Sequence, residues 1–230
     1  MELQALSVGC LEPGTETSQR FVLSAYDAVE AVLENLQKIR ELRRQETGDI
    51  RGRLPANEED LLRAAIIFTG AGLDATLKQL IRDALPRLLE TSEQAQAKFE
   101  AFAREELGTA EIADARAIAR YLTSANPRDR LIEDYIYALT GSSLQSAEEV
   151  QKTAAALGID DPKLRKRING LRDLFVARNE ISHELDLQRP ERQGDRARRS
   201  RPISGTKTLC HEGLEVGQLI INAAGLQLAI

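Results

Sequence analysis

Aromatic residues are scarce in this chain: it has no tryptophan, and aromatic side chains make up only 4% of its 230 residues. Proteins that hold single-stranded bases one by one stack them on aromatic side chains. The scarcity therefore argues against such a stacking platform. Ala, Leu, Glu, Arg and Gln dominate instead, and β-branched residues are scattered rather than grouped, which favours an all-helical domain.

Cysteine and histidine are also scarce, with two residues of each. Cys10 and Cys210 are too few for a disulfide framework and lack metal-ligand spacing, so we expect a reducing, cytoplasmic setting. His211 follows Cys210 directly, but no further cysteine or histidine stands nearby to complete a zinc site. The sequence has no His-Glu-x-x-His pattern and no glycine-rich phosphate loop. We therefore expect no metal and no cofactor.

Long uninterrupted apolar runs are missing as well. The most apolar segment, residues 214–230, is short and contains Glu215, Gln218 and Asn222, so it predicts a buried core helix rather than a membrane span. The N-terminus carries Glu2 and lacks the basic and apolar regions of a secretory signal. We expect a cytoplasmic protein without membrane contact.

Charge is unevenly distributed along the chain. The net charge of -5 argues against a general nucleic-acid coat protein. Between residues 163 and 201, however, twelve basic residues stand against six acidic ones, a local surplus of six positive charges. An acidic body with one basic segment suits a polyanionic ligand at a single site. For residues 189–201 alone, a solvated charged loop is an equally good interpretation.

Hydrophobic periodicity and punctuation by Gly and Pro predict one domain over residues 1–230. Its helical core covers about 18–89 and 163–228, with a helical insert over about 91–157 and a basic loop over 188–205. Gly70 and Gly72 lie within an apolar helix, where close helix packing or a local bend would explain them. Helices are predicted over 18–45, 58–89, 146–157, 164–187 and 206–228, with shorter amphipathic ones over 91–143.

The helix predicted over 164–187 carries the most informative residues. At about 100° per residue, Arg178 lies in the middle of its apolar stripe, and Asn179 and His183 share the neighbouring face. A buried guanidinium needs a carboxylate partner or an anionic ligand, and Asp74 on the second helix is the best candidate carboxylate. For Arg178 alone, a buried ion pair that only fixes helix register is as good an interpretation. The combination with Asn179 and His183 favours a functional site.

The segment 175–185, which reads Phe-Val-Ala-Arg-Asn-Glu-Ile-Ser-His-Glu-Leu, resembles the signature of the HEPN superfamily (higher eukaryotes and prokaryotes nucleotide-binding domains). That signature is an arginine, a polar residue, a few more positions and a histidine on a late helix of an all-α domain. Residues 64–80 resemble the family's second helix, whose acidic residue supports the arginine and the histidine. Asp74 takes that place here, where glutamate is more usual.

The resemblance implies an HEPN-like antiparallel helical bundle that acts as a metal-independent endoribonuclease of a toxin–antitoxin or antiviral-defence type. His183 would be the general acid or base, Arg178 would stabilise the phosphorane, and Asn179 would orient the histidine or the phosphate. Asp74 and Ser182 would support them. The 2′-hydroxyl of the RNA would attack and leave a 2′,3′-cyclic phosphate, which makes the reaction specific for RNA.

The resemblance also implies partners. Two protomers would face each other as a homodimer, with both motifs lining one basic cleft, and an antitoxin or another defence-system protein would bind. Some relatives carry a modifiable tyrosine two positions after the histidine, but Leu185 stands there in this chain. The residues expected to contact RNA are Arg172, Arg189, Arg192, Arg196, Arg198 and Arg199.

Two other interpretations remain open from the sequence. One is a non-catalytic HEPN-like module that binds nucleic acid, a nucleotide or a protein partner. The other is a structural or interaction protein that uses its helical insert.

Overall fold

The computed structural model describes residues 2–48, 54–108, 115–144 and 146–229. Within these ranges the regular structure is entirely α-helical, apart from one isolated antiparallel bridge between Leu187 and Arg198, so the predicted all-α class is confirmed. The helices are α1 (Glu16–Thr47), α2 (Ala56–Thr91), α3 (Glu93–Gly108), α4 (Ala115–Leu122), α5 (Pro127–Thr140), α6 (Ala147–Ala156), α7 (Pro162–Gly170), α8 (Arg172–Glu184) and α9 (Ile203–Leu228).

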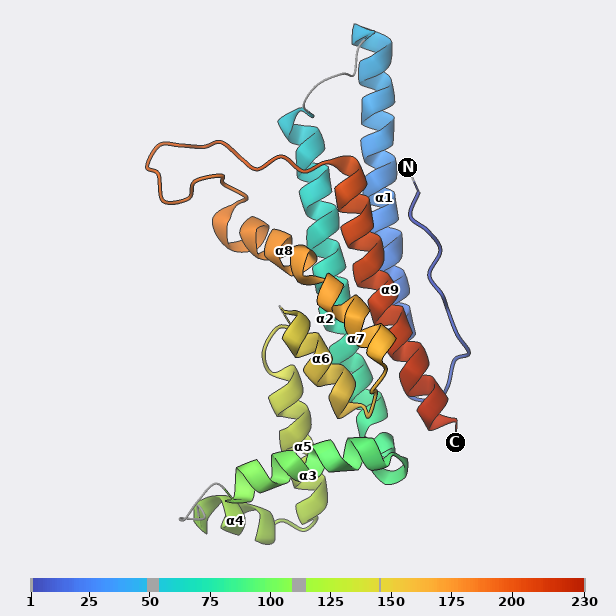
Figure 1. Cartoon of the computed structure of the whole chain (residues 1–230), viewed down its shortest axis with the longest axis vertical. Helices are drawn as coiled ribbons and strands as arrows, with labels where there is room; N and C mark the ends of the chain where they lie inside the picture. Colours follow the sequence, from blue (N-terminus) through green and yellow to red (C-terminus); the bar gives the residue numbers. More distant parts are fainter. Residues whose placement is uncertain (1, 49–53, 109–114, 145, 230) are drawn as a thin grey trace.

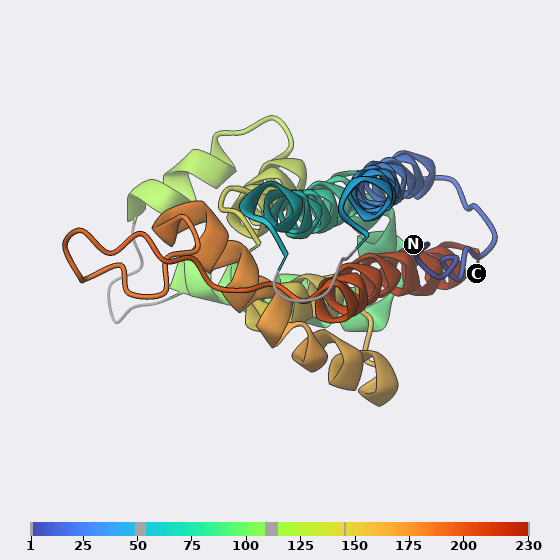
Figure 2. The same ribbon diagram turned by 90° about the horizontal axis from the view of Figure 1, so that it is seen from above.

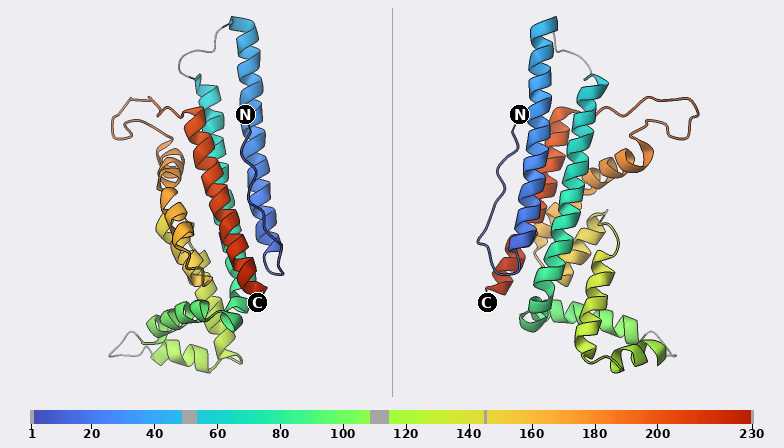
Figure 3. Two further views of the ribbon diagram at one scale, coloured as in Figure 1. Left: turned by 45° about the vertical axis from the view of Figure 1, so that its right-hand side comes forward. Right: turned by 180° about the vertical axis from the view of Figure 1, so that it is seen from behind.

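Three long helices, α1, α2 and α9, lie side by side and form the body of the molecule (Figures 1 and 3). α2 and α9 run in the same direction, and α1 runs against both (Figure 1). α2 is the central helix, because it packs against α1, α9 and α8 (Figure 2). Its core-facing side chains, among them Leu73, Leu77 and Leu80, are fully buried.

Glycines let these helices approach one another closely. A Cβ added at Gly72 would overlap the Cβ of Ala25 on α1, and one added at Gly213 on α9 would lie 2.8 Å from Thr69 Cγ2 on α2. Of the two sequence interpretations of Gly72, close helix packing and a local bend, the contact with Ala25 supports close packing. By length and composition α2 could also cross a membrane. Its apolar side chains pack against six other helices, chiefly α1, α9 and α8.

The polar residues that interrupt the apolar run of α9 hold the N-terminal segment in place. Ser7 N donates to Glu215 Oε2 at 3.0 Å, and Gly9 N donates to Asn222 Oδ1 at 3.0 Å. Gln218 exchanges two hydrogen bonds with Gln19 of α1 in the bundle interior. The expected buried core helix is present, and its interruptions satisfy polar groups of the neighbouring chain.

Helices α3 and α4 lie across the end of the bundle where the C-terminus is found, α5 stands upright beside α2, and α6 leads back to α7 (Figures 1 and 3). Phe99 and Phe102 of α3 pack against the ring of Tyr135 on α5, at centroid distances of 5.6 and 4.8 Å. Burial raises the pKa of Tyr135 to about 12. These elements occupy the stretch that the sequence predicts as a helical insert.

The predicted motif helix over 164–187 is wrong as a single helix. The chain breaks after Gly170, where Leu171 N donates to Ile168 O in a tight turn, and α7 and α8 follow separately. Glycine disfavours a helix interior by about 1 kcal/mol. The two halves also pack differently, since α7 contacts α6 and α9 whereas α8 contacts α2 and α9. Arg178, Asn179 and His183 all lie on α8.

Helix starts differ from the predicted ones as well. α1 begins at Glu16 after Thr15, so Ser18 lies inside the helix and is buried rather than at the N-cap. Pro55, not Asn57, precedes α2, and α9 begins at Ile203 directly after Pro202. Proline fixes a backbone angle that suits the entry into a helix.

Candidate polyanion site on helix α8

Arg178 lies where α8 crosses α2. Its aliphatic stem packs on Gly70, where an added Cβ would come within 3.1 Å of Arg178 Cγ. Its Nη1 donates to Asn179 Oδ1 at 3.0 Å, and the guanidinium forms no ion pair with any carboxylate of the described residues. The side chain is half-buried. An arginine in this position keeps its charge available for an anionic ligand.

The expected pair between Arg178 and Asp74 does not form. Asp74 Oδ2 lies 3.0 Å from Lys78 Nζ, one turn further along α2, and its Oδ1 accepts a hydrogen bond of 2.7 Å from Leu144 N. Lys78 lies on α2 itself, and Leu144 lies in the segment between α5 and α6. Asp74 therefore holds the connection between α5 and α6 rather than the guanidinium.

The polar residues after Arg178 face outward on α8. Asn179 and His183 stand four positions apart, so they share one helix face. His183 is exposed in the last helical turn, and its imidazole forms no hydrogen bond with a described residue; Ser182 beside it is exposed too. Asn179 is the one side chain of this group that contacts the guanidinium.

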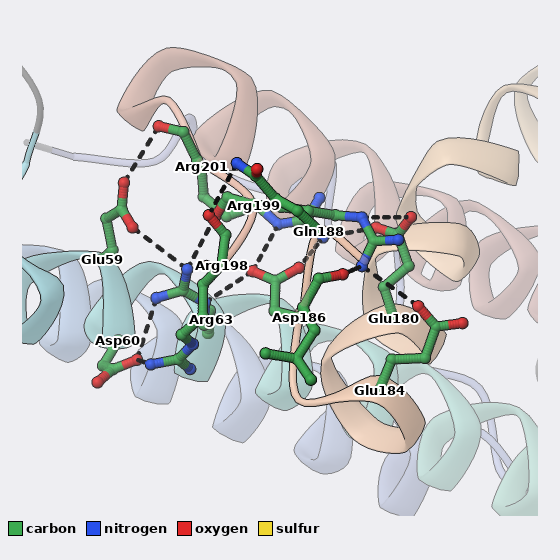
Figure 4. A network of polar contacts seen from close by, with 12 residues as sticks. Glu59, Asp60, Arg63, Glu180, Glu184, Asp186, Gln188, Arg198, Arg199 and Arg201 are labelled. Carbon is green, nitrogen blue, oxygen red and sulfur yellow. Dashed lines mark hydrogen bonds and ion pairs between the residues drawn. The ribbon is translucent and has the colours of Figure 1, made fainter. Parts of the chain in front are cut away.

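The end of α8 holds a carboxylate that the sequence analysis did not single out. Leu185 and Asp186 both adopt left-handed backbone angles, with φ of 52° and 60°. Asp186 is completely buried, and its Oδ2 accepts from Arg63 Nε of α2 at 2.7 Å and from Arg201 Nε at 3.2 Å (Figure 4). A buried carboxylate needs such partners. Burial lowers the pKa of Arg63, but the hydrogen bond to Asp186 and the charge of its carboxylate, with further hydrogen bonds to Glu59 and Asp60, hold that pKa above its ordinary value.

The signal for Arg63 was present in the sequence. Arg63 stands between Leu62 and Ile66 in an apolar helix, and Arg178 likewise stands among apolar residues of α8. Only 3% of the surface of Arg63 is exposed. It also pairs with Glu59 at 3.2 Å, and its Nη2 donates to the carbonyl of Arg199 at 2.8 Å. Arg63 is therefore fully engaged in the fold.

The basic loop is divided into a fixed base and an exposed tip. At the base, Gln188 N donates to Ala197 O at 2.8 Å, and Leu187 bridges Arg198. Arg198 pairs with Asp60 at 2.6 Å, and Arg199 pairs with Glu180 at 3.2 Å (Figure 4). Two of the predicted RNA-contacting arginines thus hold the loop against α2 and α8.

The loop tip, residues 189–196, carries three of the other four predicted arginines. Arg192 and Arg196 are exposed and form no ion pair with described residues. Arg189 is exposed and lies 3.9 Å from Asp195. Arg172, at the start of α8, is also exposed and lies 3.9 Å from Glu148. Exposed pairs at such distances contribute little to stability, so these four cations can meet a ligand.

Comparison with protein-family models, curated proteins and solved structures finds no match to the chain. The resemblance to the HEPN superfamily therefore depends on the residues of α8 and α2.

Proposed function

We propose that the chain is a metal-independent endoribonuclease of a toxin–antitoxin or antiviral-defence type, acting in the cytoplasm. One observation carries the proposal. Arg178 is half-buried against Gly70, has no carboxylate partner among the described residues, is hydrogen-bonded to Asn179, and lies on the helix that exposes His183. A cation held in place by its stem and matched by no fixed anion suits a phosphodiester.

The reaction needs a proton acceptor, a charge stabiliser and an orienting group. His183 removes the proton of the RNA 2′-hydroxyl and returns it to the leaving 5′-oxygen. Arg178 binds the phosphorane oxygens, and Asn179 fixes the guanidinium. The phosphodiester bond to the 5′-oxygen breaks as the bond to the 2′-oxygen forms. The products are a 2′,3′-cyclic phosphate and a 5′-hydroxyl, and DNA cannot react because it lacks the nucleophile.

Four exposed arginines outside the motif extend the site along a polyanion. Arg189, Arg192 and Arg196 of the loop tip and Arg172 at the start of α8 would bind RNA backbone phosphates. Arg198 and Arg199 would keep the loop in place rather than bind RNA, since carboxylates already neutralise them. In the family arrangement two protomers form a homodimer with a composite site, and an antitoxin or defence-system protein would control it.

The test is cleavage of end-labelled single-stranded RNA by purified protein in EDTA. The chain has two histidines, so His183→Ala has a matched control in His211→Ala on α9. We expect cleavage by the native chain and by His211→Ala, a cyclic phosphate end, and no cleavage by His183→Ala or of a substrate with 2′-deoxyribose at the cleavage site. Equal cleavage by native protein and His183→Ala would exclude His183 as the catalytic group.

A second function, RNA binding without cleavage, is favoured by a different observation. His183 forms no hydrogen bond with a described residue that would orient its ring. A non-catalytic HEPN-like module would bind RNA through Arg178 and the loop tip, and its affinity would fall steeply with salt. Salt-sensitive binding that Arg178→Ala weakens, with no cleavage by native protein, would support this second function over the first.

A further inference from the structure

Asp186 joins three segments that are distant in sequence. It follows the last turn of α8, and its carboxylate binds Arg63 from α2 and Arg201 from the entry to α9 (Figure 4). We call Arg63, Asp186 and Arg201 the α8 clamp. Asp186 is completely buried and Arg63 nearly so, so neither charge can be left without its partner.

The clamp holds a backbone conformation that the sequence alone does not favour. Leu185 and Asp186 are not glycines, yet both have positive φ. Residues with side chains adopt this region only where surrounding contacts stabilise it. The side chain of Leu185 is 71% exposed and supplies few such contacts. The ion pairs of Asp186, together with the backbone hydrogen bond of 2.8 Å from Arg199 N to Asp186 O, therefore fix the chain path at the end of α8.

The same contacts enclose the turn that contains His183. Asp186 N donates to Glu180 O at 2.9 Å, which closes the helix around residues 181–185. Arg201 Nη2 donates to Glu180 Oε2 at 2.7 Å and binds Asp186 as well, so one guanidinium connects both ends of this turn. The last turn of a helix ordinarily frays. Here it is fixed through Glu180, which lies three positions before His183 and is its neighbour on the helix surface.

We propose that Asp186 is a positioning residue that, through Arg63 and Arg201, sets the place of His183 relative to Arg178. It does not touch the reacting atoms. Its effect on cleavage depends on the proposed ribonuclease function, whereas its effect on the place of His183 does not. The two can therefore be measured separately.

The experiment follows the imidazole Cε1–H resonances of the folded protein by NMR and the kcat and KM of RNA cleavage, for native chain and Asp186→Asn. Only two histidines are present, so His183→Ala and His211→Ala assign both signals, and His211 on α9 serves as the internal reference. We expect the His183 signal to shift or broaden and the His211 signal to stay. We expect kcat to fall about ten- to a hundredfold, the effect of a misplaced catalytic group, with a smaller change in KM.

The matched control is Asp134→Asn, which removes a carboxylate bound to Arg120 and Tyr121 at the other end of the molecule. It should leave both histidine signals and kcat unchanged. If Asp186→Asn does not fold, Arg201→Gln replaces it, because it removes one of the two arginine partners and retains Arg63. An unmoved His183 signal in a folded variant would overturn the positioning role. A moved signal in a chain that never cleaves RNA would support that role and reject the ribonuclease proposal.

Discussion

Two arginines that lie along the same side of α2, one on α2 and one on α8, differ in whether carboxylates bind them. Arg63 of α2 has carboxylates from Glu59, Asp60 and Asp186 around it. Arg178 packs on α2 two turns further along, at Gly70, and among the described residues its guanidinium is bound by the amide of Asn179 alone. Each arginine interrupts an apolar helix stripe. An arginine inside an apolar pattern can therefore be fully paired with carboxylates, as Arg63 is, or have no carboxylate partner among the described residues, as Arg178 does.

The basic loop repeats this contrast on a smaller scale. Arg198, Arg199 and Arg201 at its base form ion pairs, and Arg192 and Arg196 at its tip form none with described residues. A charge that carboxylates have already neutralised adds little attraction for a polyanion. The function of each arginine therefore follows from its partners rather than from its place in a basic segment.

The largest effect on stability is expected at Arg63. Arg63→Ala leaves Asp186 buried with only Arg201 as partner, and breaking a buried ion pair in this way costs about 3–5 kcal/mol. Urea unfolding followed by circular dichroism measures the loss. The control is Arg104→Ala, which removes an exposed pair with Glu100 and should cost less than about 0.5 kcal/mol. Equal losses in the two variants would remove the distinction between the two kinds of arginine.

Arg178→Ala should show the reverse pattern. The free energy of unfolding should change by less than about 1 kcal/mol because no ion pair is broken. RNA cleavage should fall about 100- to 1000-fold, the effect of losing one group that stabilises charge in the transition state. Arg178→Lys, which keeps the charge but not the planar fork, should restore only part of the activity. A large loss of stability with unchanged cleavage would make Arg178 a structural residue like Arg63.

Gly70→Ala tests whether the packed stem of Arg178 matters. The new methyl group would lie 3.1 Å from Arg178 Cγ and would displace the guanidinium without removing it. We expect cleavage to fall about tenfold, while a helix-propensity gain of about 1 kcal/mol offsets the crowding in the unfolding free energy. Gly170→Ala is the control, since its methyl meets no described atom within 4 Å. Native kcat and KM in Gly70→Ala would contradict a positioned guanidinium.

The smallest effect is expected at the loop tip. Replacing Arg189, Arg192 and Arg196 together by Gln should leave the unfolding midpoint within experimental error. If all three bind phosphates, the slope of log affinity for single-stranded RNA against log salt should fall by about 2, because each contact contributes about 0.7. Filter binding at several salt concentrations measures the slope. An unchanged slope would show that the tip does not contact RNA.

Much of the helical architecture followed from local pattern. The periodic apolar residues of α1 and α2 predicted both helices to within a few residues, and the insert was expected to contain short helices, as α3, α4 and α5 are. The break at Gly170 was not predicted, because the apolar spacing continues across it and a single glycine costs too little to end a helix without the different packing of α7 and α8. The partner of Arg178 was also predicted wrongly, since Asp74 binds Lys78 and the amide of Leu144 instead.

The sequence by itself determined the all-α class and the helical conformation of Arg178, Asn179 and His183, though not the bounds of their helix, because helical spacing is a local property. Only the tertiary structure decided which arginines are neutralised. Arg63 meets Asp186 across 123 residues, and Arg178 meets Gly70 instead of Asp74. Ion pairs form between groups that folding brings within a few ångströms, and the order of residues along the chain does not contain those distances.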